Sequence, residues 1–346
     1  MGRSFAFVSS RGGVGKSTLA AQLSAAYATS HPDATVILID SSVHADSSSF
    51  LVGGMQAPVD GESKSMAESI LAQSNKDFAA LMNALIAAPA QGLSRLWGRA
   101  PGSSRVNVLD YALKPSDVWA SGDAPANLHV LPGGRALTSI TTETAPVMAS
   151  ALAELVRSSP TNYTFIFDTD AELRERVAST IACVAAEKII VVTSSMWSDF
   201  LRILTDPSNS LIDFLNDLTD PRKIAHFVFT NIPKTRNDPS ALHGTEVLSF
   251  KPDKEASNNI EQIVSYVFER SSDGPFRPLL TMPIEPQITA FTQSKVSGVF
   301  AINEKIIQKS TLMAQPIVCM TTSASTPDAL ETAQTALVYA ATRVFS

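Results

Sequence analysis

Cysteine is scarce in this sequence, which has Cys183 and Cys319 and no others among its 346 residues. Two thiols cannot build a disulfide framework or a metal cluster by themselves, so we expect both to pack as small hydrophobic side chains. The first predicted strand already begins at residue 5, which leaves no space for a leader peptide before it. Together these features predict a protein of a reducing compartment, the cytoplasm.

Long apolar runs and excess positive charge are also missing. No run approaches the roughly 18 residues of a membrane span. The 27 Lys and Arg residues are outnumbered by 33 Asp and Glu, which gives a formal net charge of −6. Non-specific binding to DNA requires a basic surface, so this charge argues against DNA as a partner. A local basic cluster at 222–223 and 234–236 is more typical of a solvated loop.

What the sequence has is a hydrophobic fraction of 45%, arranged as short apolar runs that alternate with amphipathic segments. Such alternation predicts an α/β fold: a doubly wound, mostly parallel sheet with helices on both faces, in a single domain spanning 1–346. The predicted strands lie at 5–9, 36–39, 128–131, 164–167, 188–192, 224–230 and 279–282. Predicted helices include 147–157, 173–185, 197–218, 260–270 and 328–345.

The stretch 55–105 interrupts this alternation. It is polar and rich in Ala and Ser, and it ends in a segment with Pro, Gly and Ser. We expect two helices and a loose Pro/Gly/Ser loop there, inserted into the domain. Because the insertion adds to the fold rather than building it, we expect it to be the surface that binds a protein partner.

A phosphate-binding loop is predicted at residues 9–18, which read Ser-Ser-Arg-Gly-Gly-Val-Gly-Lys-Ser-Thr between a strand and a helical segment. The glycines allow successive backbone N–H groups to face one anion, and the helix N-terminus adds partial positive charge. Lys16 suits the β- and γ-phosphates, and the Ser17 hydroxyl suits Mg²⁺. Ser10 stands where the strict pattern has glycine. The predicted nucleotide contacts are Gly12, Gly13, Val14, Gly15, Lys16, Ser17 and Thr18.

The loop RGGVGKST resembles the KGGxGK[ST] loop of the ParA/MinD family of P-loop ATPases. In that family the cation before the paired glycines is a lysine that reaches the nucleotide of a second subunit. Here that residue is Arg11, which keeps the charge and offers a planar fork suited to phosphate. The resemblance therefore implies a nucleotide-dependent homodimer in which Arg11 acts across the interface.

Acidic residues follow two of the predicted strands. The resemblance implies that Asp40 and Asp168 support Mg²⁺, with Ser17 as the third metal residue, and that Lys16, Arg11 and Asp40 form the catalytic set. Family members carry a second Asp, which polarises water, at the position of Ser42. We therefore expect slow hydrolysis, and we expect Ser42→Asp to raise it. Asp46 is a candidate replacement if its loop folds back, and Asp170 is a possible extra ligand.

Two further positions resemble the family's base-binding elements. The strand 227–230 ends at Asn231, where relatives contact adenine, and Pro283 lies in a segment like the loop that closes over the base. No guanine-binding [NT]-K-x-D motif follows Asn231, which favours ATP or ADP.

The resemblance implies an ATP- and Mg²⁺-dependent dimerisation switch that positions or assembles a partner. The alternative is a catalytically weak or inactive nucleotide-binding scaffold subunit of a larger complex, which the missing carboxylate at Ser42 and the long insertion favour. An iron–sulfur carrier would need a Cys-x-x-Cys pair, and a dinucleotide oxidoreductase would need G-x-G-x-x-G; the sequence has neither.

Overall fold

The computed structural model describes most of the chain, and the site residues fall largely within the described part. Of the predicted site, Pro283 and the side chain of Asn231 lie outside it, as does the 55–105 stretch apart from 76–87. The described residues are 2–52, 76–87, 106–117, 124–171, 173, 175–205, 210–218, 223–232, 253–272, 274–280, 282, 287–300, 306, 310, 315–320 and 327–345.

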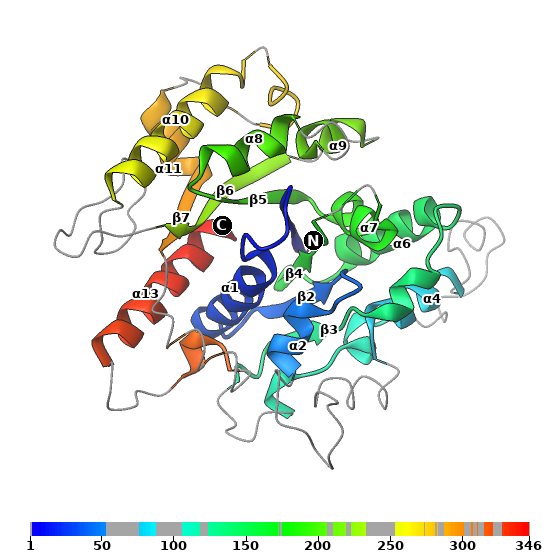
Figure 1. The fold of residues 1–346 in the computed structure, drawn as a ribbon. Coiled ribbons are helices and arrows are strands. Elements are labelled where there is room, and N and C mark those ends of the chain that lie inside the picture. Colours follow the sequence, from blue (N-terminus) through cyan, green and yellow to red (C-terminus); the bar gives the residue numbers. More distant parts are fainter. Residues whose placement is uncertain are drawn as a thin grey trace, which may run out of the picture.

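A seven-stranded parallel sheet forms the centre of the molecule, with strand order β3-β2-β4-β1-β5-β6-β7 (Figure 1). The chain starts in the middle at β1 and builds outward in both directions, which is the doubly wound arrangement that the sequence predicted. Six of the seven strands coincide with predicted ones. The strands are β1 Arg3–Val8, β2 Thr35–Asp40, β3 Leu128–Leu131, β4 Tyr163–Asp168, β5 Lys188–Ser194, β6 Lys223–Ile232 and β7 Val296–Phe300.

Helices cover both faces of this sheet, each over its own hydrophobic core. Alternate strand residues point to opposite faces, so Phe5 and Phe7 lie in one core while Ala6 and Val8 lie in the other. The core of Phe5 and Phe7 is covered by α1 Lys16–Ser30, α2 Asp46–Val52 and α13 Pro327–Val344. The opposite core is covered by α4 Phe78–Ala87, α6 Ala145–Ser158, α7 Val177–Ala185, α8 Trp197–Thr205, α9 Leu211–Asp217, α10 Lys254–Glu269 and α11 Ile288–Lys295.

Two predicted elements were wrong. The described residues of 279–282 form no strand, and the edge strand is β7 instead. The predicted helix 197–218 is two helices, because Ser210 begins α9 by accepting a hydrogen bond from the Asp213 backbone N–H at 3.2 Å.

Part of the predicted insertion belongs to the core. Helix α4 packs against α6, and its Phe78, Leu81 and Met82 side chains are buried. Cys183 is buried in the same core, as expected, and burial raises the pKa of its thiol to about 12. Cys319, by contrast, is only partly buried. None of the described helices is long and apolar enough to cross a lipid bilayer.

Candidate nucleotide-binding site

The glycine-rich loop runs from the carboxyl end of β1 into the first turn of α1. Gly13 and Gly15 have φ angles of +82°, in the left-handed region that glycine adopts without strain. Val14 between them is buried, and its carbonyl accepts a hydrogen bond from the Thr230 hydroxyl at 2.6 Å. The end of β6 therefore anchors the loop, and it brings the backbone of Asn231 next to it. The adenine contact itself remains a prediction.

Lys16 begins α1, and its side chain is almost fully buried. Its ammonium donates to Asp168 Oδ1 at 2.7 Å and also to the backbone carbonyl of Thr169. Asp168 ends β4, the strand beside β1, so the sheet register brings this acid to the loop. The predicted phosphate-binding lysine and the predicted metal-binding acid thus form a buried ion pair.

The second oxygen of Asp168 is the best evidence for a cation site. Asp168 Oδ2 is buried and has no hydrogen-bond partner among the described residues. A buried, unsatisfied carboxylate oxygen is costly unless it gains a cation or a donor. Ser17 lies next to Lys16 in the first turn of α1, and hard oxygen atoms of this kind suit Mg²⁺. Asp168 and Ser17 therefore fit the predicted metal site.

Asp40 occupies a different environment from the one its predicted role requires. It is fully buried and lies opposite Asp168 across the β2–β4 pair. Burial, and then the charge of Asp168, raise the pKa of its carboxyl above the usual value. Both of its oxygens already accept hydrogen bonds from Ser42, Ser47 and Ser48. In this arrangement Asp40 organises the segment after β2, and metal binding or catalysis would require it to give up these bonds.

Ser42 points into this network rather than away from it. Its hydroxyl donates to Asp40 Oδ1 at 2.7 Å and accepts from the Ala45 backbone N–H at 3.1 Å. Asp46 is exposed in the first turn of α2. Among the described residues, no hydrogen bond or ion pair joins its side chain to Asp40, Ser42 or Lys16. Asp170 lies 3.8 Å from the Arg176 side chain, as an ion pair.

Arg11 contacts an acid that the sequence analysis missed. Its Nη1 lies 2.5 Å from Oδ1 of Asp199, in the first turn of α8. The other oxygen of Asp199 accepts a hydrogen bond from the Ser194 hydroxyl at 2.6 Å. Arg11 is 48% exposed, whereas Asp199 is 7% exposed. In this structure the loop cation is therefore bound within its own chain.

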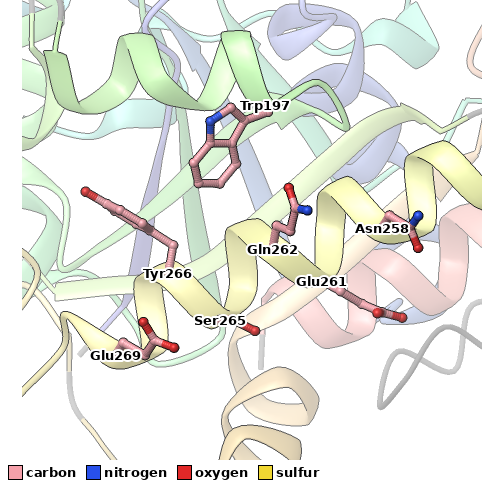
Figure 2. Close-up of a pocket in the computed structure, with 7 residues that line it drawn as sticks. All are labelled: Trp197, Asn258, Glu261, Gln262, Ser265, Tyr266 and Glu269. Atoms are coloured by element: carbon pink, nitrogen blue, oxygen red, sulfur yellow. The ribbon is translucent and has the colours of Figure 1, made fainter.

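Helix α8 also borders a groove, which its Trp197 side chain lines. The groove holds about 560 Å³ and lies between the start of α8 and one face of α10 (Figure 2). Trp197 faces Tyr266 and Gln262 across it, and its ring lies 5.7 Å from that of Tyr266. Trp197 is two residues from Asp199, so the same helical turn borders both the groove and the loop.

Comparisons with known proteins identify the fold. No protein-family profile matches the sequence, and no curated protein matches it either. Among solved structures, pNOB8 ParA is 13% identical with a TM-score of 0.59, over 99% of this chain and 98% of that one. MinD in the MinC:MinD cell division complex of Aquifex aeolicus is 14% identical, with a TM-score of 0.51 and coverages of 99% and 95%.

A third structure is a putative plasmid partition protein of Borrelia burgdorferi B31 bound to AMPPNP. It is 12% identical with a TM-score of 0.51, over 98% of each chain. At these identities the likeness establishes the fold: this chain has the fold of the ParA and MinD ATPases. One structure of pNOB8 ParA is bound to nonspecific DNA, so the fold gives no argument against DNA, and that expectation depends on charge alone.

Proposed function

We propose that this chain binds ATP with Mg²⁺ and acts as a nucleotide-dependent dimerisation switch with slow hydrolysis, which positions or assembles a partner. The observation that carries the proposal is the pairing of both loop cations with acids of the same chain. Lys16 is paired with Asp168 and Arg11 with Asp199. When a nucleotide binds, its phosphate oxygens would replace these carboxylates as the partners of Lys16 and Arg11.

Nucleotide binding follows from this exchange. When a triphosphate enters the loop, its β- and γ-oxygens compete with Asp168 for the ammonium of Lys16, and the loop's N–H groups receive the same anion. Asp168 then loses its pairing with Lys16, and its Oδ2 still lacks a hydrogen-bond partner among the described residues. Asp168 and Ser17 would hold Mg²⁺, which would supply positive charge that neutralises the phosphates. The AMPPNP complex of the Borrelia protein with this fold supports the choice of nucleotide.

Slow hydrolysis is expected from the segment after β2. A water that attacks the γ-phosphate needs an oriented acceptor, and Ser42 supplies a hydroxyl that is already bonded to Asp40. Positioning and electrostatic stabilisation by Lys16 still support some turnover, because they dominate this chemistry.

Dimerisation through the surface that bears Arg11 is supported by exposure. The Arg11 side chain is 48% exposed, and Met196, one turn before the Asp199 that Arg11 contacts, is 58% exposed. Arg and Met are both enriched at surfaces that bind other proteins. The partner and its binding surface, for which 55–105 remains our candidate, are part of the proposal.

The scaffold alternative keeps one specific observation in its favour. The buried hydrogen bonds around Asp40 fix the segment that would need to move during a catalytic cycle. A subunit that holds its nucleotide permanently needs no such movement.

The test measures the bound nucleotide, the ATPase rate, and the molar mass in solution with AMPPNP and with ADP. A dimer that forms with AMPPNP and dissolves with ADP supports the switch. A constant mass with tightly retained nucleotide and no turnover supports the scaffold. Lys16→Ala should lose nucleotide binding in either case, whereas Lys114→Ala, at a lysine outside the site, should retain it. Normal affinity in Lys16→Ala would contradict the loop assignment.

A further inference from the structure

The pair between Arg11 and Asp199 is built more firmly than an ordinary surface contact. Asp199 is 7% exposed, and the Ser194 hydroxyl holds its second oxygen at 2.6 Å. The same hydroxyl also accepts the Met196 backbone N–H at 3.1 Å, where the chain turns from β5 into α8. A buried carboxylate that is held in one orientation loses little side-chain entropy when it binds a guanidinium.

A simpler explanation for Asp199 is that an acid in the first turn favours the helix dipole. That role explains neither its burial nor the two side chains that reach it. It also requires no contact with the loop, which lies far away in the sequence. The contact links the loop after β1 with the helix after β5, at the carboxyl edge of the sheet, where the nucleotide is expected.

We propose that Asp199 is a positioning residue that retains Arg11 on its own subunit in the resting state, and so sets how readily the protein self-associates. This inference rests on the proposed switch. In the nucleotide-bound dimer, the guanidinium must leave Asp199 to reach the second subunit. The free energy of the broken pair therefore opposes association, and it does so twice, once in each subunit.

The experiment compares the wild-type chain with Asp199→Asn, which keeps the shape but weakens the pair. Two quantities are measured: the protein concentration at half-association with AMPPNP and Mg²⁺, by analytical ultracentrifugation, and the affinity of the monomer for AMPPNP at dilution. We expect the concentration at half-association to fall roughly ten-fold, as for loss of a modest ion pair in each subunit. The monomer's affinity should change by less than about two-fold, because Lys16 and the loop remain intact.

Three further variants make the result specific. Ser194→Ala releases the second oxygen of Asp199 without touching any charge, and should shift association in the same direction by roughly two-fold. Adding Asp199→Asn to Arg11→Ala should have no further effect, because the pair is already lost. Asp213→Asn, an exposed acid in the next helix, should leave association unchanged.

The outcomes separate this inference from the switch itself. If the wild type associates with AMPPNP but Asp199→Asn does so at the same concentration, the inference is wrong and the switch stands. If neither associates although both bind nucleotide, both proposals are wrong. Association by Asp199→Asn alone supports the inference, because the pair then suffices to block dimerisation. If Asp199→Asn unfolds at a lower urea concentration than the wild type, the Ser194→Ala variant provides the test instead. An unchanged concentration at half-association in Ser194→Ala would then overturn the inference.

Discussion

The side chain of Ser42 shows how one residue can hold a site in a particular state. Its hydroxyl and backbone N–H both donate to Asp40 Oδ1, and Ser47 and Ser48 donate to Oδ2. A carboxylate with this many donors is fully satisfied although it is buried next to a second acid. The ParA/MinD pattern has an Asp where this chain has Ser42. The substitution therefore does more than remove a base, because Ser42 itself holds Asp40 and the segment after β2 in place.

This geometry changes the expectation for Ser42→Asp. The new carboxylate would replace a donor by a negative charge within hydrogen-bond distance of buried Asp40, so we now expect no gain in turnover. The free energy of unfolding should fall by about 3 kcal/mol, as for a buried uncompensated charge. Ser42→Thr keeps the hydroxyl and should stay within about 1 kcal/mol of the wild type. Urea denaturation and ATPase assays check both variants. A faster Ser42→Asp enzyme of normal stability would show that the segment rearranges.

His226 gives a prediction for the pH dependence of stability. Burial, and then the positive charges of Arg343, Lys295 and Lys188, lower the pKa of its imidazole to about 4. The unfolded chain binds this proton near pH 6.5 and the folded chain does not, so stability is full above pH 6.5 and falls below it. Between pH 7.5 and pH 5 the loss from this residue should be about 2 kcal/mol.

Urea denaturation at the two pH values tests this. His226→Gln should remove about 2 kcal/mol from the difference between them, whatever its effect on the stability at pH 7.5. The exposed His44 provides the matched control, and His44→Gln should leave the difference unchanged. An equal pH dependence in the wild type and His226→Gln would mean that His226 is not buried as a neutral side chain.

At the scale of elements, the central strands were predictable because each is a short apolar run with its turn signals. The edge strand β7 was not, since Val296–Phe300 contains a polar residue and a glycine and shows no alternation. The run at 279–282 was misleading for the opposite reason. Leu279 and Leu280 are buried, but they lie in and just after a turn that follows Phe276, and a short apolar run does not reveal which structure buries it.

The junction between the ends of β2 and β3 yields a prediction of its own. A side-chain carbon added at Gly133 would lie 2.4 Å from the Ser42 carbonyl oxygen and 2.9 Å from Asp40 Oδ1. The first neighbour is a backbone oxygen, and the second is a buried side-chain oxygen held by two hydrogen bonds from Ser42. Gly133→Ala should therefore cost about 3 kcal/mol of stability and displace the segment after β2. Gly12→Ala is the control, because it meets nothing within 4 Å and has no left-handed φ. Equal unfolding midpoints for the two variants would contradict this packing.

At the scale of the whole molecule, the sequence predicted which residues form the loop but not where its cations rest. Lys16 begins the helix that follows β1, and Asp168 ends β4, so their motifs place both residues at the carboxyl edge of the sheet, although the ion pair between them was not predicted. Asp199 and Thr230 reach the loop only because β5 and β6 follow β1 in the sheet. No local pattern marks an acid or a threonine for such a contact, which depends on strand order.

Net charge gives the last prediction, on DNA. A protein with a formal charge of −6 releases few counterions when it approaches a duplex, unless its basic residues are concentrated on one face. We expect no binding to a short mixed-sequence duplex at about 150 mM salt with micromolar protein, with or without AMPPNP, by fluorescence anisotropy. Saturable binding that weakens steeply with salt would contradict the argument from net charge. Such an outcome has a precedent in this fold, because one structure of pNOB8 ParA is bound to nonspecific DNA. Charge reversal at Lys234 and Arg236 would then show whether that basic segment binds the duplex, because removing its interactions with phosphates should flatten the salt dependence.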